Sequence, residues 1–144
     1  MRRHEALIPL THDHHHGLAQ ARRLRLAAKT DDEARLEAAK AFLRFFRDDT
    51  LAHFRDEEER VFPLAVEAPE CRPTLERVVF EHLQIHALAR VLQSDVDQDA
   101  ARPPHMVRLA DVLEGHIRFE EKVVFPLIER IAADVLSDLA LVDP

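Results

Sequence analysis

The most constraining feature of this sequence is a pattern that occurs twice. Residues 53–64 and residues 116–127 both read H-x-x-x-E-E-x-x-x-F-P-L. On a helix, a histidine and a glutamate four residues apart lie on one face, one turn from each other. An imidazole and a carboxylate placed in this way can hold one metal ion or share a pair of ions. The two copies therefore predict two helices that face a metal site and are related by a pseudo-dyad.

The composition indicates one helical domain. The chain has 144 residues, so a single domain over residues 1–144 is expected. It contains 2 glycines and is rich in Ala, Leu, Glu and Arg, which favours helix over sheet. The net charge of −7 argues against nonspecific binding to nucleic acid, which requires a basic face.

The sequence also indicates where the protein works. No apolar run reaches the roughly 18 residues of a membrane span, and the first residues lack the apolar segment of a signal peptide. The only cysteine, Cys71, allows no intrachain disulfide, which fits a reducing compartment. We therefore expect a cytoplasmic protein that does not bind membranes.

Apolar residues recur at spacings of three and four, and no strand-like alternation is present. This periodicity predicts four helices, followed by a tail (134–144) that has room for a short helix; the helices span residues 13–29, 32–66, 73–96 and 104–133. Thr11 or Asp13 is expected to cap the first helix, and Pro63 to bend or end the second. Short connections between amphipathic helices predict an all-α, up-down-up-down four-helix bundle.

Polar side chains interrupt the apolar stripes near the middle of each helix. The candidate metal ligands are His14, His15, His53, Glu57, His82, His86, His116 and Glu120. His14 is in phase with the apolar stripe of its helix, and His15 is the alternative. His12 and His16 are expected to be exposed or to lie beside the ligands. Glu58, Glu59 and Glu121 are out of phase and are expected on the solvated face.

Each of these residues alone has an ordinary explanation, but together they indicate a metal site. A lone histidine on an apolar face is usually a core or boundary residue, whereas an unpaired buried carboxylate is costly. Five histidines and two carboxylates on the inner stripes of four helices would lack partners without a metal. Imidazole and carboxylate without thiolate suit iron or manganese better than structural zinc. Seven ligands are more than one tetrahedral ion can bind, and they are enough for two ions.

The arrangement H…HxxxE…HxxxH…HxxxE resembles the hemerythrin-like, or HHE cation-binding, domain over about residues 10–133. The resemblance implies two non-haem iron ions, bridged by two carboxylates and an oxo or hydroxo group, inside the bundle. Carried over, the terminal ligands are His53, His82, His86 and His116, and the bridging ligands are Glu57 and Glu120. Manganese or zinc is a less favoured occupant.

The resemblance also bears on function. Hemerythrins that carry oxygen often have an aspartate five residues after the last histidine, whereas Glu120 stands four residues after His116. This departure argues against plain oxygen transport. The expected partner is dioxygen or another small diatomic molecule or peroxide, bound for sensing, delivery or detoxification. The alternatives are a di-iron enzyme that turns over peroxide or nitric oxide, an interaction module that responds to iron or oxygen, and a structural bundle with zinc or no metal.

Overall fold

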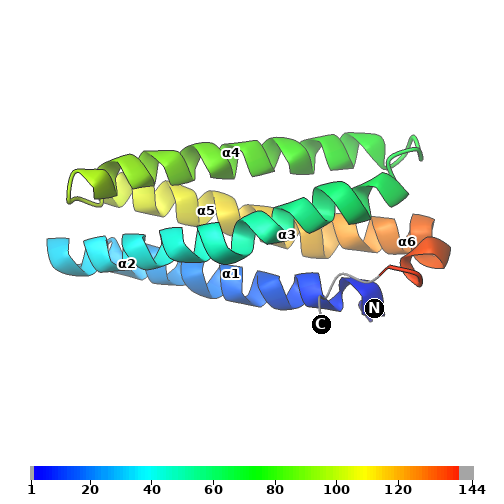
Figure 1. The fold of residues 1–144 in the computed structure, drawn as a ribbon, viewed down its shortest axis with the longest axis horizontal. Coiled ribbons are helices and arrows are strands. Elements are labelled where there is room, and N and C mark those ends of the chain that lie inside the picture. Colours follow the sequence, from blue (N-terminus) through cyan, green and yellow to red (C-terminus); the bar gives the residue numbers. More distant parts are fainter. Residues whose placement is uncertain (1, 140–144) are drawn as a thin grey trace.

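Four helical rods lie side by side along the long axis of the molecule (Figure 1). The structure is a computed structural model that describes residues 2–139. The rods are formed by α1 (Ile8–Ala27), by α2 (Asp32–Phe45) with α3 (Leu51–Asp56), by α4 (Arg72–Asp97), and by α5 (Pro103–Phe119) with α6 (Phe125–Leu136). The predicted up-down-up-down four-helix bundle is confirmed.

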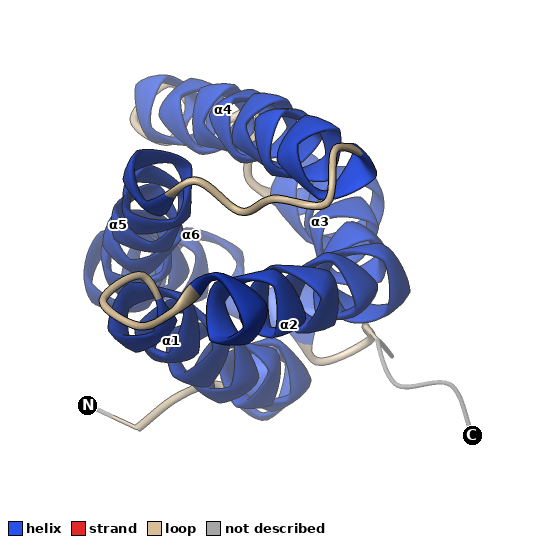
Figure 2. Ribbon diagram, turned by 90° about the vertical axis from the view of Figure 1, so that its left-hand side faces the viewer, coloured by secondary structure: helices blue, strands red, loops and turns tan. Residues whose placement is uncertain are grey.

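Consecutive rods are neighbours, and the last rod returns to the first. In the end-on view, α1, α2, α4 and α5 surround a common axis in that order (Figure 2). The contacts agree, because α1 packs on α2, α2 on α4, α4 on α5, and α5 on α1. Short connections at residues 28–31, 65–71 and 98–102 make each rod antiparallel to the next. Each rod therefore faces the interior and also two seams, one with each neighbour.

The first rod begins earlier than the sequence predicted. A 3₁₀ turn at Glu5–Leu7 leads directly into α1, and Pro9 lies in the first turn of the helix, where a missing N–H costs nothing. Neither Thr11 nor Asp13 is a cap; the Nδ1 atom of His4 caps the 3₁₀ turn by accepting a hydrogen bond from the Ala6 N–H at 3.0 Å. Residues 5–12, which the sequence placed before the first helix, are thus helical.

The other rod ends lie near their predicted positions. The second rod ends in a 3₁₀ turn at Phe62–Leu64 that contains Pro63, as expected for a residue without an N–H donor. The last rod has a kink at Ala132 (φ −122°, ψ 22°), next to the predicted end at residue 133, and a short helical stretch continues from there to Leu136. Residues 140–144 of the predicted tail lie outside the described residues.

Three π-helical segments interrupt the rods, and the hydrophobic pattern did not predict them. They are Phe46–Thr50, Glu57–Val61 and Glu120–Val124. A π turn contains more residues than an α turn, so it shifts the helix face that follows it. The expected stripe of the last rod continued from Glu120 to Val123, but Val123 is 44% exposed and Val124 is buried. The core-facing residues of α6 are accordingly one position later than the sequence predicted.

Two apolar clusters fill the bundle, one on each side of a polar layer. One cluster contains Phe42, Leu92 and Leu109, and the other contains Leu10, Val61 and Ile128. The buried histidines and glutamates lie between these clusters along the rods. Among the described helices, none is both long and apolar enough to cross a membrane.

Candidate metal centre

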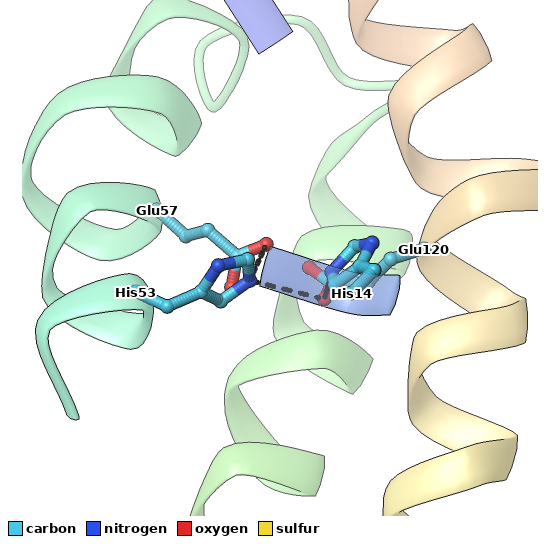
Figure 3. Close-up of side chains that lie close together, drawn as sticks. All are labelled: His14, His53, Glu57 and Glu120. Atoms are coloured by element: carbon cyan, nitrogen blue, oxygen red, sulfur yellow. Dashed lines mark hydrogen bonds and ion pairs between the residues drawn. The ribbon is translucent and has the colours of Figure 1, made fainter. Parts of the chain in front are cut away.

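Six of the eight candidate ligands converge in the polar layer. They are His14 from α1, His53 from α3, Glu57 at the start of a π-helical segment, His82 from α4, His116 from α5, and Glu120 at the start of another π-helical segment. All six are buried, and neither glutamate has measurable exposure. Four of these side chains, from three rods, point toward one another in Figure 3.

The six residues form two overlapping groups that share both glutamates. One group is His14, His53, Glu57 and Glu120, and the other is Glu57, His82, His116 and Glu120. Within each group, one donor atom per residue lies within 4.8 Å of the others. The imidazoles accordingly form two pairs, with ring centroids 4.8 Å apart for His14 and His53 and 4.9 Å apart for His82 and His116. This arrangement has room for two cations bridged by two carboxylates.

The geometry of α1 distinguishes His14 from His15, the two candidate ligands that the sequence left open. His14 is 3% exposed and points into the polar layer, whereas the neighbouring His15 is exposed. His12 and His16 are exposed as well. His15 therefore lies outside the group, because one residue along a helix rotates the side chain by about 100°.

His86 also lies outside the group, in contrast to the prediction. α4 is a regular helix, so a residue four positions after His82 is rotated by about 40° from it. The Phe54 ring fills the space beside His82, with stacked ring centroids 3.8 Å apart, and His86 contacts the edges of Phe54 and Phe46 from an exposed position. Six inward residues are present where the sequence predicted seven.

Three of the four nitrogens that face inward lack hydrogen-bond partners, whereas His14 Nε2 lies 3.1 Å from Glu120 Oε1. Among the described residues, the buried atoms without a hydrogen bond include Nε2 of His53, His82 and His116, both carboxylate oxygens of Glu57, and Oε2 of Glu120. Several of them are close together: His116 Nε2 lies 3.0 Å from Glu120 Oε1, and His82 Nε2 lies 3.2 Å from Glu57 Oε1. Buried polar atoms are normally hydrogen-bonded, so this concentration needs a compensating charge. Lone pairs that converge in this way fit metal cations.

The opposite nitrogen of each histidine contacts a carboxylate from a neighbouring rod. The pairs are His14 Nδ1 with Glu121 Oε2 at 2.6 Å, His53 Nδ1 with Asp13 Oδ2 at 3.0 Å, His82 Nδ1 with Glu58 Oε2 at 2.5 Å, and His116 Nδ1 with Glu81 Oε1 at 2.8 Å. An ionised carboxylate only accepts hydrogen bonds, so each Nδ1 carries a proton. The Nε2 lone pair of a neutral imidazole is then directed inward, as metal ligation requires.

These four carboxylates were missed or misplaced by sequence reasoning. Glu58 and Glu121 were expected on the solvated face, and no role was expected for Asp13 or Glu81 in the site. A signal was nevertheless present, because each carboxylate is the immediate chain neighbour of an inward residue. The second glutamate of the repeated Glu-Glu pair therefore contacts a histidine on a neighbouring rod.

Without metal, protons supply the positive charge in this layer. Burial opposes protonation of His116, but attraction to Glu120 and the contact with Glu81 raise its pKa to about 10. Burial also opposes ionisation of Glu120, yet the charge of His116 and its polar neighbours hold the pKa of Glu120 well below the ordinary range. Repulsion between Glu57 and Glu120 alone would raise carboxylate pKa values, but for Glu120 the imidazoles dominate.

A small cavity adjoins one side of the group. Its lining is formed by His14, Gly17, Phe45, Asp49, Thr50, His53, Phe54, Leu113, His116, Ile117 and Glu120. It gives about 20 Å³ of room to the centre of a water-sized molecule, which is sufficient for a water or a diatomic molecule. The cavity contacts both histidines of the His14–His53 pair and only one histidine of the other pair. It therefore lies closer to the His14–His53 pair than to the other pair.

Close packing of α1 against α5 shapes this cavity. A Cβ atom at Gly17 would lie 2.8 Å from Cδ1 of Ile117, which is closer than real Cβ contacts allow. Glycine at position 17 thus keeps Ile117 in place at the edge of the cavity. Thr50 and Asp49 belong to the π-helical segment Phe46–Thr50, which forms another part of the lining.

Comparison with known proteins identifies a family. A family model described as the Hemerythrin HHE cation binding domain matches residues 7–128. No curated protein and no solved structure matches the chain. The matched range includes all six inward residues and all four carboxylates that contact them.

Proposed function

Because the chain belongs to the hemerythrin HHE cation-binding family, we propose that it binds two iron ions and, next to them, dioxygen or a related small molecule. The observation that carries the proposal is the set of converging, unpartnered donor atoms on His53, Glu57, His82, His116 and Glu120. His14 completes the set from α1.

The proposed ligand roles follow from the two overlapping groups. One cation is held by His14 and His53, the other by His82 and His116, and Glu57 and Glu120 are shared by both. Mixed imidazole and carboxylate ligation without thiolate favours iron or manganese over structural zinc. Cys71 cannot contribute, because it packs in the apolar cluster with Leu10 and Val61.

Bound iron would supply electrons and an open coordination position for a small oxidant. The residues of this chain supply the surroundings. The cavity beside His14 and His53 limits the ligand to a small molecule, and apolar side chains such as Leu113 and Ile117 keep bulk water away from it. The exposed surface of the cavity is apolar, which suits a small uncharged molecule such as dioxygen.

Anaerobic addition of oxygen to reduced, iron-loaded protein tests this function. The proposal predicts two irons per chain and an optical change that reverses when oxygen is removed. Irreversible consumption of oxygen or peroxide would instead support the enzymatic alternative. Iron-dependent stabilisation without any reaction with gases would contradict small-molecule binding and favour an interaction module.

A further inference from the structure

The four carboxylates that contact the buried histidines form a closed ring around the bundle. Asp13 on α1 contacts His53 on α3, Glu58 contacts His82 on α4, Glu81 on α4 contacts His116 on α5, and Glu121 contacts His14 on α1. Each rod therefore provides a carboxylate to the next rod and receives one from the previous rod. The contacts run in one direction and close after four steps.

The ring follows from helix geometry. Each carboxylate is adjacent in sequence to an inward residue: Asp13 to His14, Glu58 to Glu57, Glu81 to His82, and Glu121 to Glu120. One residue rotates a side chain by about 100° around the helix, from the interior to a seam with a neighbouring rod. In every rod, one residue thus points into the interior, and the residue next to it in sequence contacts a histidine on the neighbouring rod.

The positions of the ring residues also repeat between the two halves of the chain. Asp13 and Glu81 each stand one residue before a buried histidine, and Glu58 and Glu121 each stand one residue after a buried glutamate. The four contacts are consequently two equivalent pairs, one in each half of the chain. A regular arrangement of this kind is not expected of surface ion pairs that form by chance.

The members of the ring differ in how firmly they are held. The Glu81 side chain is 15% exposed and also accepts a hydrogen bond from Arg77 Nε at 3.1 Å. Glu121 is 27% exposed and accepts hydrogen bonds from Arg3 and Thr11. The side chains of Asp13 and Glu58 are 48% and 41% exposed. The strongest effect is therefore expected at Glu81.

We propose that Asp13, Glu58, Glu81 and Glu121 are positioning residues that keep the proton of each imidazole on Nδ1 and the Nε2 lone pair directed at the metal. This inference rests on the proposed metal centre. A carboxylate behind a ligating histidine fixes its orientation and makes it a stronger donor. Because the ring is closed, the orientation of each ligand depends on the neighbouring rod, which couples metal binding to assembly of the whole bundle.

Alanine and amide variants of the ring test the proposal. Zn²⁺ is used as a diamagnetic probe, and its affinity is measured by competition with a chelator. We expect Glu81→Ala and Glu58→Ala to bind Zn²⁺ about 10- to 100-fold more weakly than the wild type. Glu81→Gln keeps an acceptor atom and should retain part of the affinity. Glu59→Ala is the matched control, because Glu59 is the exposed neighbour of Glu58 and lies outside the ring.

A second readout reports orientation directly. Long-range ¹H–¹⁵N spectra of the Zn²⁺-loaded wild type should show the four ring histidines protonated at Nδ1, as well as His105, whose Nδ1 contacts Asp95 away from the ring. One low-field Nδ1–H signal should be lost in each alanine variant, and the His105 signal should remain. Asp13→Ala extends the test to the most exposed member of the ring, where a folding defect is least expected. If the wild type binds two Zn²⁺ ions and the alanine variants match its affinity within twofold, the ring has no positioning role. Failure of the wild type to bind two ions would instead overturn the metal centre, and the ring with it.

Discussion

Glu57 and Glu120 occupy equivalent positions in the two halves of the chain, and each is the first residue of a five-residue π-helical segment. Each stands four residues after a buried histidine, and both contribute an oxygen to the two overlapping donor groups. π-helical turns occur often at functional sites, because they re-aim side chains that an α-helix would place elsewhere. The shared geometry supports the view that both glutamates contact both metals.

Substitution of Glu120 and of Glu121 should have different effects. Glu120→Gln removes a shared ligand and should lower the iron content below two per chain. Glu121→Gln keeps an acceptor for His14 Nδ1, so it should preserve the stoichiometry and only weaken binding. Iron analysis and the optical spectrum distinguish the two. Loss of the di-iron spectrum in Glu121→Gln but not in Glu120→Gln would show that Glu121, and not Glu120, is the metal ligand.

Metal removal should destabilise the protein. A metal that binds only the folded state stabilises it by about 2.7 kcal/mol at a free concentration 100 times Kd. The buried, unpartnered atoms of Glu57 and His82 would lose their cation in the metal-free form. We expect a lower Tm after treatment with a chelator and recovery when iron is restored. Melting curves that coincide with and without metal would contradict the site.

The metal-free protein should be most stable in mildly acidic solution. The pKa of His116 is raised from 6.5 to about 10. Its contribution to the free energy of unfolding is therefore complete below pH 6.5 and is lost as the pH rises through 10. Burial opposes ionisation of Glu121, but hydrogen bonds from His14 and Thr11 lower its pKa from 4.5 to about 2. The contribution of Glu121 to the free energy of unfolding is complete above pH 4.5 and is lost as the pH falls toward 2.

Urea unfolding of the metal-free protein measures this dependence. The free energy of unfolding should be greatest between about pH 4.5 and 6.5 and should decrease on both sides. Glu121→Gln should reduce the decrease on the acid side. Because Glu121 also helps to raise the pKa of His14 against the opposing effect of burial, the variant should lose part of the decrease on the alkaline side and keep the part that His116 contributes. A free energy that rises steadily from pH 7 to pH 10 would show that His116 is not protonated in the folded state.

The two glycines offer a matched test of the cavity. Gly17→Ala would bring a Cβ atom within 2.8 Å of Ile117, which should shift that side chain and alter the cavity. Oxygen binding should weaken while two irons remain bound. Gly115→Ala meets nothing within 4 Å, so it should leave oxygen binding unchanged and stabilise the helix by about 0.5–1 kcal/mol. Equal oxygen affinity in both variants would exclude the cavity as the ligand site.

The sequence was informative where side-chain type and helical phase agreed. His53, Glu57, His116 and Glu120 could be placed on inner faces because they are in phase with the apolar residues of their helices, and a metal could be inferred because buried carboxylates there would otherwise be unpaired. The hydrophobic pattern failed where two adjacent residues were equally apolar. Val123 and Val124 are both valine, so periodicity alone could not reveal that a π turn exposes the first and buries the second.

The remaining errors concern residues whose positions depend on contacts with other helices, which the pattern of a single helix does not show. His86 was assigned to the site by its spacing from His82, but the Phe54 ring from another rod occupies the adjacent space. Glu58 and Glu121 were assigned to solvent because they leave the apolar stripe, although a seam between rods lies at that angle. Their partners become visible only when neighbouring rods are in place.

The most direct test of the metal centre is an anomalous difference map, measured at the iron edge, from crystals of the iron-loaded protein. We predict two peaks in the polar layer, one beside Nε2 of His14 and His53 and one beside Nε2 of His82 and His116, with Glu57 and Glu120 contacting both. A single peak, or peaks only at the exposed His12 and His16, would contradict a di-iron centre inside the bundle.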